Sequence, residues 1–185
     1  MSSDTLVQEV QEVQETTAAL NKALAAAVHE GGKFLTFFLD SEEYALEILT
    51  VHEIIGVMAI TPVPRTPEFI LGVLNLRGRV IPVIDLRSKF GMETVEWTEE
   101  TCIIVVQIQG SQRGIVVDKV SEVLDIPAAD IDETPSFGSN VNTDYIMGIG
   151  KSETNVKLLL DIEKALTNED LSELTATAKF SDNQN

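Results

Sequence analysis

The spacing of apolar residues changes at Gly31-Gly32, which divides the chain into two regions of different pattern. Over residues 4–29, apolar side chains recur at alternating steps of four and three, which predicts one amphipathic helix. Ser3 or Asp4 would cap this helix, and the glycine pair ends it. The apolar stripe of this helix is as narrow as the seam of a coiled coil. Three interpretations stay open: the helix docks on its own domain, binds another chain, or forms a frayed extension.

Short β-strands arranged in hairpins are predicted downstream of Gly32. Each hairpin consists of two apolar runs separated by a short polar or glycine-containing break. The predicted pairs are 34–39 with 44–49, 73–76 with 80–84, and 102–109 with 114–120, and a last strand covers 156–160. The other expected elements are helical turns at 67–70 and 86–90, a polar connection at 125–134, a turn at 145–148, a closing helix at 163–174 and a mobile tail after Thr175.

Three sequence matches, in the same order along both halves of this region, indicate an internal duplication. Residues 44–55 match 113–124, each a strand followed by a Val-x-Glu-[Ile/Val] turn. Residues 69–73 match 145–149, and residues 83–86 match 159–162. Two units of short strands are too small for separate full cores and too few for a repeat array, so they predict two small barrels with a shared interface.

The predicted organisation follows from this duplication. We expect an N-terminal helix and linker over 1–32, one duplicated domain over 33–166, and a helix end with its tail over 167–185. The fold class is mainly β, with short helices and the added N-terminal amphipathic helix. The seam between the barrels is expected to form a binding groove, lined by the exposed ends of the two Val-x-Glu-[Ile/Val] turns.

Composition and charge exclude several classes of function. The formal net charge of -17 disfavours nucleic acid and anionic lipid surfaces, because both are bound through clustered Lys and Arg. The apolar runs are too short to cross a bilayer and no secretory leader is apparent, so we expect a cytoplasmic protein. Cys102, the single cysteine, sits beside a β-branched run and is interpreted as a small hydrophobe.

The residues needed for catalysis or metal binding are not found in the sequence. There are two histidines, His29 and His52, and neither belongs to a cluster with metal-ligand spacing, so we expect no enzyme activity, metal or cofactor. Gly150-Lys151-Ser152 resembles the end of a P-loop without its leading glycine, and is interpreted as chance. Arg77 leaves two interpretations open: a solvated residue in a tight turn with Gly78 at positive φ, or an arginine held at the groove for a partner's carboxylate or carbonyls.

The sequence resembles the CheW family of chemotaxis coupling proteins, over about 33–166. The resemblance is carried by several motifs in the family's order: Asn75-Leu76-Arg77-Gly78, Val80 to Phe90, Phe34 to Leu39, Tyr44-Ala45-Leu46, Val51-x-Glu53-Ile54, Thr66-Pro67-x-Phe69-Ile70-x-Gly72-Val73, Gly114 to Val120, and Tyr145-x-x-Gly148. The resemblance implies two intertwined SH3-like five-stranded β-barrels. The N-terminal helix lies outside the region of resemblance.

The function that the resemblance implies is that of a non-catalytic adaptor, which couples chemoreceptors to a CheA-type histidine kinase. The implied partners are the cytoplasmic tip of a receptor's helical hairpin and the regulatory domain of the kinase, in membrane-associated receptor arrays. Carried over by position, the receptor-binding residues are Val51, Glu53, Ile54, Gly72, Arg77 and Cys102. The implied kinase-binding residues are Ile60 and Thr61 in one loop, and Pro135 and Phe137 in another.

Two alternatives remain open, and one position departs from the family pattern. The first alternative is the same module in a non-flagellar chemosensory array, serving twitching motility or development. The second is a small-molecule-binding β-barrel, which would require a closed pocket with convergent polar groups. Ser136 stands where the family often has an acidic residue, which weakens the expectation of a salt-bridged kinase contact there but not that of an apolar contact.

Overall fold

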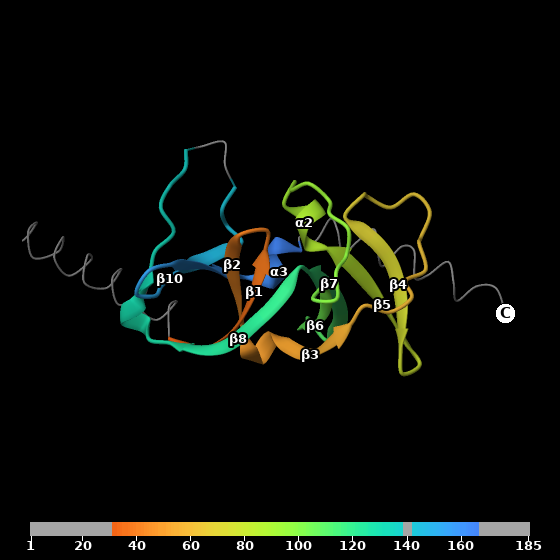
Figure 1. The fold of residues 1–185 in the computed structure, drawn as a ribbon, viewed down its shortest axis with the longest axis horizontal. Helices are drawn as coiled ribbons and strands as arrows, with labels where there is room; N and C mark the ends of the chain where they lie inside the picture. Colours follow the sequence, from red (N-terminus) through yellow and green to blue (C-terminus); the bar gives the residue numbers. More distant parts are fainter. Residues whose placement is uncertain (1–30, 139–141, 167–185) are drawn as a thin grey trace, which may run out of the picture.

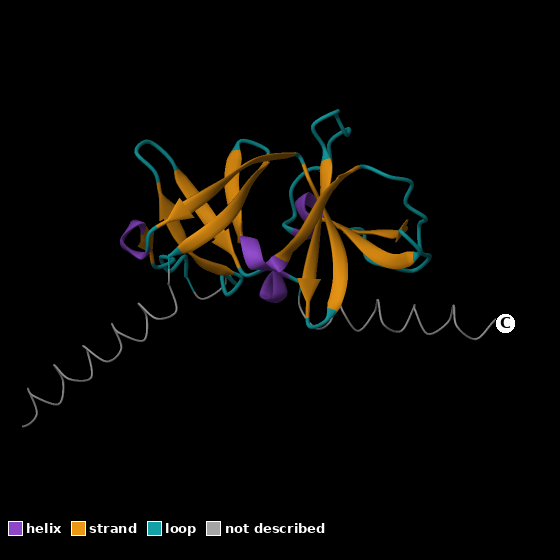
Figure 2. Ribbon diagram, turned by 90° about the horizontal axis from the view of Figure 1, so that it is seen from below, coloured by secondary structure: helices purple, strands orange, loops and turns teal. Residues whose placement is uncertain are grey.

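The computed structural model describes residues 31–138 and 142–166. The predicted N-terminal helix, most of the closing helix predicted at 163–174, and the tail therefore lie outside the described residues. Within the described ranges, no helix is long and apolar enough to cross a membrane. The domain itself is built almost entirely of β-strands (Figures 1 and 2).

Two β-sheets, each curled into a small barrel, form the domain. The six-stranded sheet has the order β8-β1-β2-β11-β10-β9, and the five-stranded sheet has the order β3-β6-β7-β5-β4. The strands of the six-stranded sheet are β1 (Gly32–Leu39), β2 (Glu42–Glu47), β8 (Lys119–Ile126), β9 (Ile131–Asp132), β10 (Ile146–Lys151) and β11 (Val156–Leu160). Those of the five-stranded sheet are β3 (Val51–Gly56), β4 (Ile70–Leu76), β5 (Arg79–Asp85), β6 (Cys102–Ile108) and β7 (Ser111–Val117).

The chain crosses between the two sheets twice, which makes the barrels intertwined as the resemblance implied. The first crossing runs from β2 through the 3₁₀ turn η1 (Ile48–Thr50) into β3, and the second runs from β7 into β8 at Asp118. Short helices α2 (Leu86–Lys89) and α3 (Ile162–Ala165) follow β5 and β11, and a 3₁₀ turn η2 (Ala128–Asp130) precedes β9. The six-stranded barrel is therefore built from chain that precedes and follows the contiguous strands β3 to β7 of the five-stranded barrel.

The predicted duplication is confirmed by the pairing of equivalent strands. β11 pairs in parallel with β2 through Leu159 and Ala45, and β5 pairs in parallel with β7 through the equivalent residues Val83 and Gly114. Both β4–β5 and β10–β11 are antiparallel hairpins with a bulge near their start. After each hairpin an aspartate, Asp85 or Asp161, caps the following short helix with its carboxylate. The sequence matches thus reflect one structural unit used twice.

Three clusters of buried apolar side chains hold the domain together. One fills the five-stranded barrel, one fills the six-stranded barrel, and the largest lies between the two sheets. A row of stacked aromatic rings crosses this middle cluster, in which Phe90 lies between Tyr44 and Tyr145, with centroid distances of 6.0 and 5.2 Å. Because burial disfavours the charged phenolate, the pKa of Tyr44 is raised. The interface between barrels is therefore a core in its own right.

The structure corrects three sequence-based boundaries. Val51 to Gly56, expected to contain a turn after the second strand, forms the separate strand β3. The run expected as one strand at 114–120 is divided at Asp118 into β7 and β8, because the chain leaves one sheet there and enters the other. The turn expected at 145–148 is largely the start of strand β10. The edge strands β3 and β8 lack the apolar alternation of a half-buried strand, and β10 starts with two adjacent apolar residues before a glycine.

Candidate functional site

The first part of the candidate site is the edge strand β3. Its residues alternate between half-buried and exposed, and it pairs on one side with β6. Val51 packs against the core between the barrels, while Ile54 points outward with 44% of its surface exposed. An exposed isoleucine on an edge strand offers apolar contact area to a partner.

Arg77 and Glu53 form a bidentate ion pair beside Ile54. Arg77 comes from the β4–β5 turn, where it and Gly78 have φ values of 52° and 85°, and the Asn75 side chain accepts a hydrogen bond from the Gly78 amide. Its two terminal nitrogens lie 2.7 and 2.8 Å from the Glu53 carboxylate oxygens. This hydrogen-bonded contact lowers the pKa of Glu53. The expected tight turn is thus confirmed, and its arginine is oriented by Glu53 while its side chain stays 71% exposed.

Gly72 and Cys102 support the site from within the barrel. A Cβ on Gly72, whose φ is 139°, would lie 2.0 Å from the carbonyl oxygen of Thr61. Thr61 and Val73 exchange two backbone hydrogen bonds across this contact and so close the five-stranded barrel. Cys102 is half-buried, and burial raises the pKa of its thiol, although a hydrogen bond with the Val120 backbone opposes that shift. Gly72 therefore permits the closure of the five-stranded barrel, and Cys102 contacts the start of β8.

The edge strand β8 is the duplicated counterpart of β3; the repeat placed its Val-x-Glu-[Ile/Val] segment at the groove, although the family resemblance assigned none of its residues to receptor binding. Val123 of β8 matches Ile54 of β3 in the repeat, and it is 50% exposed. Val120 matches Val51, and both pack against the same core between the barrels. Figure 1 shows β3 and β8 along the same lower side of the molecule. Aligning the two halves is the signal that identifies Val123; we call Val51, Glu53, Ile54, Arg77, Val120 and Val123 the edge-strand surface.

The residues implied for kinase binding belong to two different barrels. Ile60 packs against the interior of the five-stranded barrel, and the adjacent Thr61 closes that barrel. Pro135 and Phe137 follow β9, which closes the six-stranded barrel through Asp132 and Ile149 in a corresponding way. Phe137 is 59% exposed. The two segments thus lie at comparable corners of the two barrels, and the structure does not bring them into one site.

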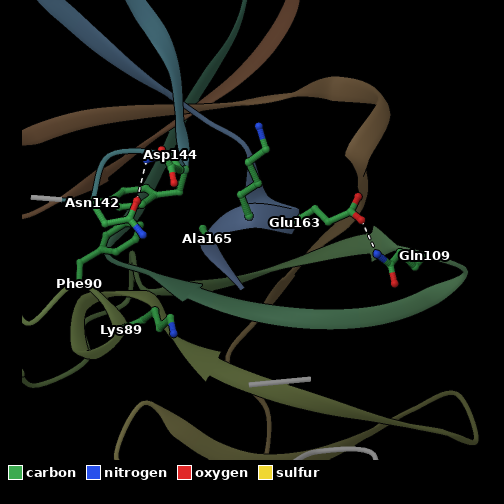
Figure 3. A pocket seen from close by; sticks show the side chains of 9 residues that line it. Lys89, Phe90, Gln109, Asn142, Asp144, Glu163 and Ala165 are labelled. Atoms are coloured by element: carbon green, nitrogen blue, oxygen red, sulfur yellow. Dashed lines mark hydrogen bonds between the residues drawn. The ribbon is translucent and has the colours of Figure 1, made fainter. Parts of the chain in front are cut away.

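A cavity of about 820 Å³ lies between the two halves, away from the repeated Val-x-Glu-[Ile/Val] segments (Figure 3). Its lining comes from α2, α3, the loop before β10 and Gln109, so it is separate from the groove that the sequence predicts beside those segments. Phe90 and Tyr145 form its apolar wall. Glu163 accepts a hydrogen bond from Gln109, so that carboxylate is already engaged within the protein.

The two interlocked barrels and their exposed edge strands define a protein-binding scaffold domain. A family model described as the CheW-like domain matches residues 33–170, and the chain belongs to this family. A chemotaxis protein CheW from Klebsiella aerogenes is 42% identical, over 80% of this chain and 90% of that protein. Protein FrzA from Myxococcus xanthus is 30% identical, over 80% of this chain and 93% of its own length.

A solved structure agrees with the sequence comparisons. The scaffolding protein TtCheW from Thermoanaerobacter tengcongensis superposes with a TM-score of 0.69 and 35% identity, covering 76% of this chain and 95% of that chain. The matched region begins where the sequence resemblance began, at Lys33. The chain is accordingly a chemotaxis coupling adaptor of the CheW-like family, whose members are scaffold proteins.

Proposed function

We propose that this chain couples the cytoplasmic tip of a chemoreceptor to the regulatory domain of a CheA-type histidine kinase, at membrane-associated receptor arrays in the cytoplasm. The observation that carries the proposal is the edge-strand surface, in which exposed apolar residues flank an arginine that is already oriented. A receptor tip is a helical hairpin, and a helix with an apolar face is recognised in a groove through a few anchor residues.

The receptor contact is assigned to β3 and β8. Ile54 and Val123 would contact the apolar face of the receptor helix, since both are half-exposed and occupy equivalent edge positions. Arg77 would donate hydrogen bonds to the helix, because Glu53 fixes its guanidinium while most of the side chain stays accessible. Holding the arginine in place before binding reduces the entropy lost on association.

The kinase contact is assigned to the corners of the barrels. Phe137 is the exposed aromatic anchor, and residues of this kind supply much of the binding energy in interfaces. Ile60 and Thr61 mark the corresponding corner of the other barrel. Because these segments are outside the edge-strand surface, we expect receptor and kinase to bind together.

A non-flagellar chemosensory array is the second candidate setting. The observation that favours it is the similarity to protein FrzA, at 30% identity over most of both chains. Tagging the chain in its native cell and identifying the co-purified kinase would separate the settings, because each array has its own kinase.

Replacing Arg77 with alanine tests the proposed coupling. In a reconstituted mixture of kinase, receptor fragment and this chain, Arg77→Ala should weaken receptor binding about 30-fold and remove receptor-dependent kinase activation, as expected for an arginine anchor. Arg79→Ala is the matched control, since Arg79 is exposed two residues away and is expected to leave activation unchanged. Full activation by Arg77→Ala would contradict the assigned receptor surface.

A further inference from the structure

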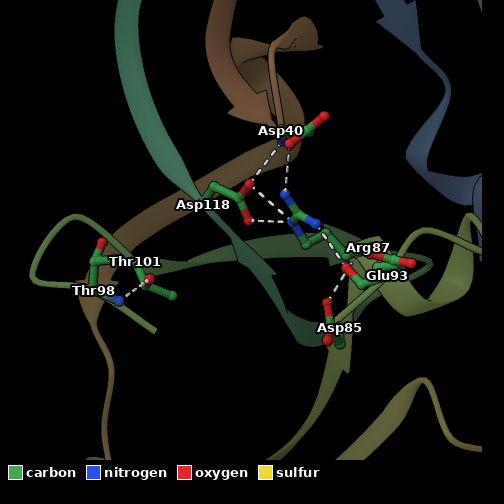
Figure 4. Close-up of polar contacts among 7 residues, drawn as sticks. All are labelled: Asp40, Asp85, Arg87, Glu93, Thr98, Thr101 and Asp118. Carbon is green, nitrogen blue, oxygen red and sulfur yellow. Dashed lines mark hydrogen bonds and ion pairs between the residues drawn. The ribbon is translucent and has the colours of Figure 1, made fainter. Parts of the chain in front are cut away.

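An ion cluster at the second crossing between the sheets connects the two barrels (Figure 4). Arg87 of α2, with 9% of its side chain exposed, directs its Nε toward both carboxylate oxygens of Asp118 at 2.9 Å. Its terminal nitrogens reach the Glu93 carbonyl oxygen at 2.7 Å and the Asp40 carboxylate at 3.3 Å. One guanidinium therefore contacts three separate segments.

Asp118 is held from two sides. It is the single residue between β7 and β8, so it marks the point where the chain passes from one sheet to the other. Its carboxylate accepts a hydrogen bond from the Asp40 amide at 2.7 Å, and its own amide donates to the Phe38 carbonyl. The crossing is consequently fixed to the β1–β2 turn of one sheet and, through Arg87, to the helix that follows β5 of the other.

A gain in the free energy of folding does not explain why Arg87 and Asp118 are paired at this crossing. A buried ion pair loses about as much in desolvation as it gains in attraction, so replacing it with apolar groups is often neutral. Charged groups that are held in a fixed geometry instead keep the segments that they join in one defined position. The segment joined here is the start of β8, which carries half of the edge-strand surface.

We propose that Arg87 and Asp118 are positioning residues for receptor binding, which set β8 at the correct distance from β3. This inference rests on the proposed function. β3 and β8 belong to different sheets, and each begins directly after a crossing. A helix that contacts both strands is sensitive to their spacing, whereas each of the segments assigned to the kinase lies within a single barrel and outside these two strands.

Beside the apolar core between the barrels, other polar contacts also act on the spacing of β3 and β8. The Cys102 thiol, on the strand paired with β3, hydrogen-bonds with the Val120 backbone, and Lys119 pairs with Glu100 at 2.9 Å. Farther along, Thr36 of β1 exchanges hydrogen bonds with the Glu122 backbone and so holds β8 on its own sheet. Of the two charged contacts, Arg87–Asp118 is the shielded one, so it is less weakened by water and salt than the exposed Lys119–Glu100 pair.

Asp118→Asn tests the proposal because it keeps the shape of the side chain and removes its charge. We expect the affinity for a soluble receptor hairpin fragment to fall about tenfold, a typical size for coupling between sites, and the affinity for the isolated kinase regulatory domain to stay within about twofold. Glu153→Gln is the matched control: it also neutralises one carboxylate, in the exposed turn between β10 and β11, outside β3, β8 and the segments assigned to the kinase. It should change neither affinity, since isolated exposed charges contribute little.

Arg87→Lys provides a second variant in case Asp118→Asn does not fold cooperatively. Lysine keeps the charge but cannot reach all three segments, so a smaller loss of receptor affinity is expected, again without loss of kinase affinity. Equal losses for both partners, or no loss for either, would overturn the proposal. A wild-type chain that binds the kinase domain but no receptor fragment would contradict the proposed receptor function itself.

Discussion

Ile54→Glu is expected to weaken binding of a receptor hairpin fragment by about 100-fold or more, because it would bury a carboxylate against an apolar helix face. The variant should remain folded, since Ile54 is 44% exposed on an edge strand and leaves no cavity when replaced. The measurement is the affinity for the fragment by calorimetry, alongside thermal unfolding. Val123→Glu should give a loss of similar size, because Val123 occupies the equivalent position on β8.

The matched control for both variants is Val156→Glu. Val156 is 52% exposed on β11, so the substitution introduces the same charge at a similarly exposed valine outside the edge-strand surface. We expect normal receptor affinity for this variant. If Ile54→Glu and Val156→Glu bound the fragment equally well, the edge-strand surface would not be the receptor contact.

Gly72→Ala is expected to lower the free energy of unfolding by about 3 kcal/mol, from backbone strain and steric overlap together. A Cβ at this position would lie 2.0 Å from the Thr61 carbonyl oxygen, and φ at 139° is unfavourable for alanine. The hydrogen bonds between Thr61 and Val73 would have to lengthen, which opens the five-stranded barrel. Urea unfolding followed by circular dichroism measures the change.

Gly56→Ala is the control for that experiment. Gly56 also lies in the five-stranded sheet, but an added Cβ there would meet nothing within 4 Å. Its effect should stay within about 0.5 kcal/mol, as for surface substitutions in general. Equal stability of Gly72→Ala and wild type would show that the barrel is not closed in the way described.

Sequence patterns predicted the hairpins because local turn residues and apolar runs determine them. Arg77-Gly78 and Gln109-Gly110 both adopt positive φ in short turns between paired strands, as the glycine-containing breaks indicated. The break at Asp118 was not predicted, because two charged residues, Asp118 and Lys119, between Val117 and Val120 do not by themselves show that the chain changes sheets. Its cause is the long-range contact with Arg87, which no local pattern contains.

The candidate site was predictable in part. Family motifs selected Glu53 and Arg77 separately, but their ion pair depends on how the β4–β5 turn approaches β3, so it required the structure. Gly72 was expected on the receptor side, and the structure supplies a conformational reason for a glycine there. Val123 was accessible from the repeat, since its half of the duplication aligns it with Ile54.

The central claim is that this chain holds two other proteins at the same time. Its most direct test is sedimentation analysis of the chain mixed with a soluble receptor fragment and the kinase regulatory domain. We predict a single complex that contains all three components, with the receptor fragment lost from it in Ile54→Glu. Displacement of the kinase domain by the receptor fragment would contradict the claim, because one shared surface cannot couple two partners.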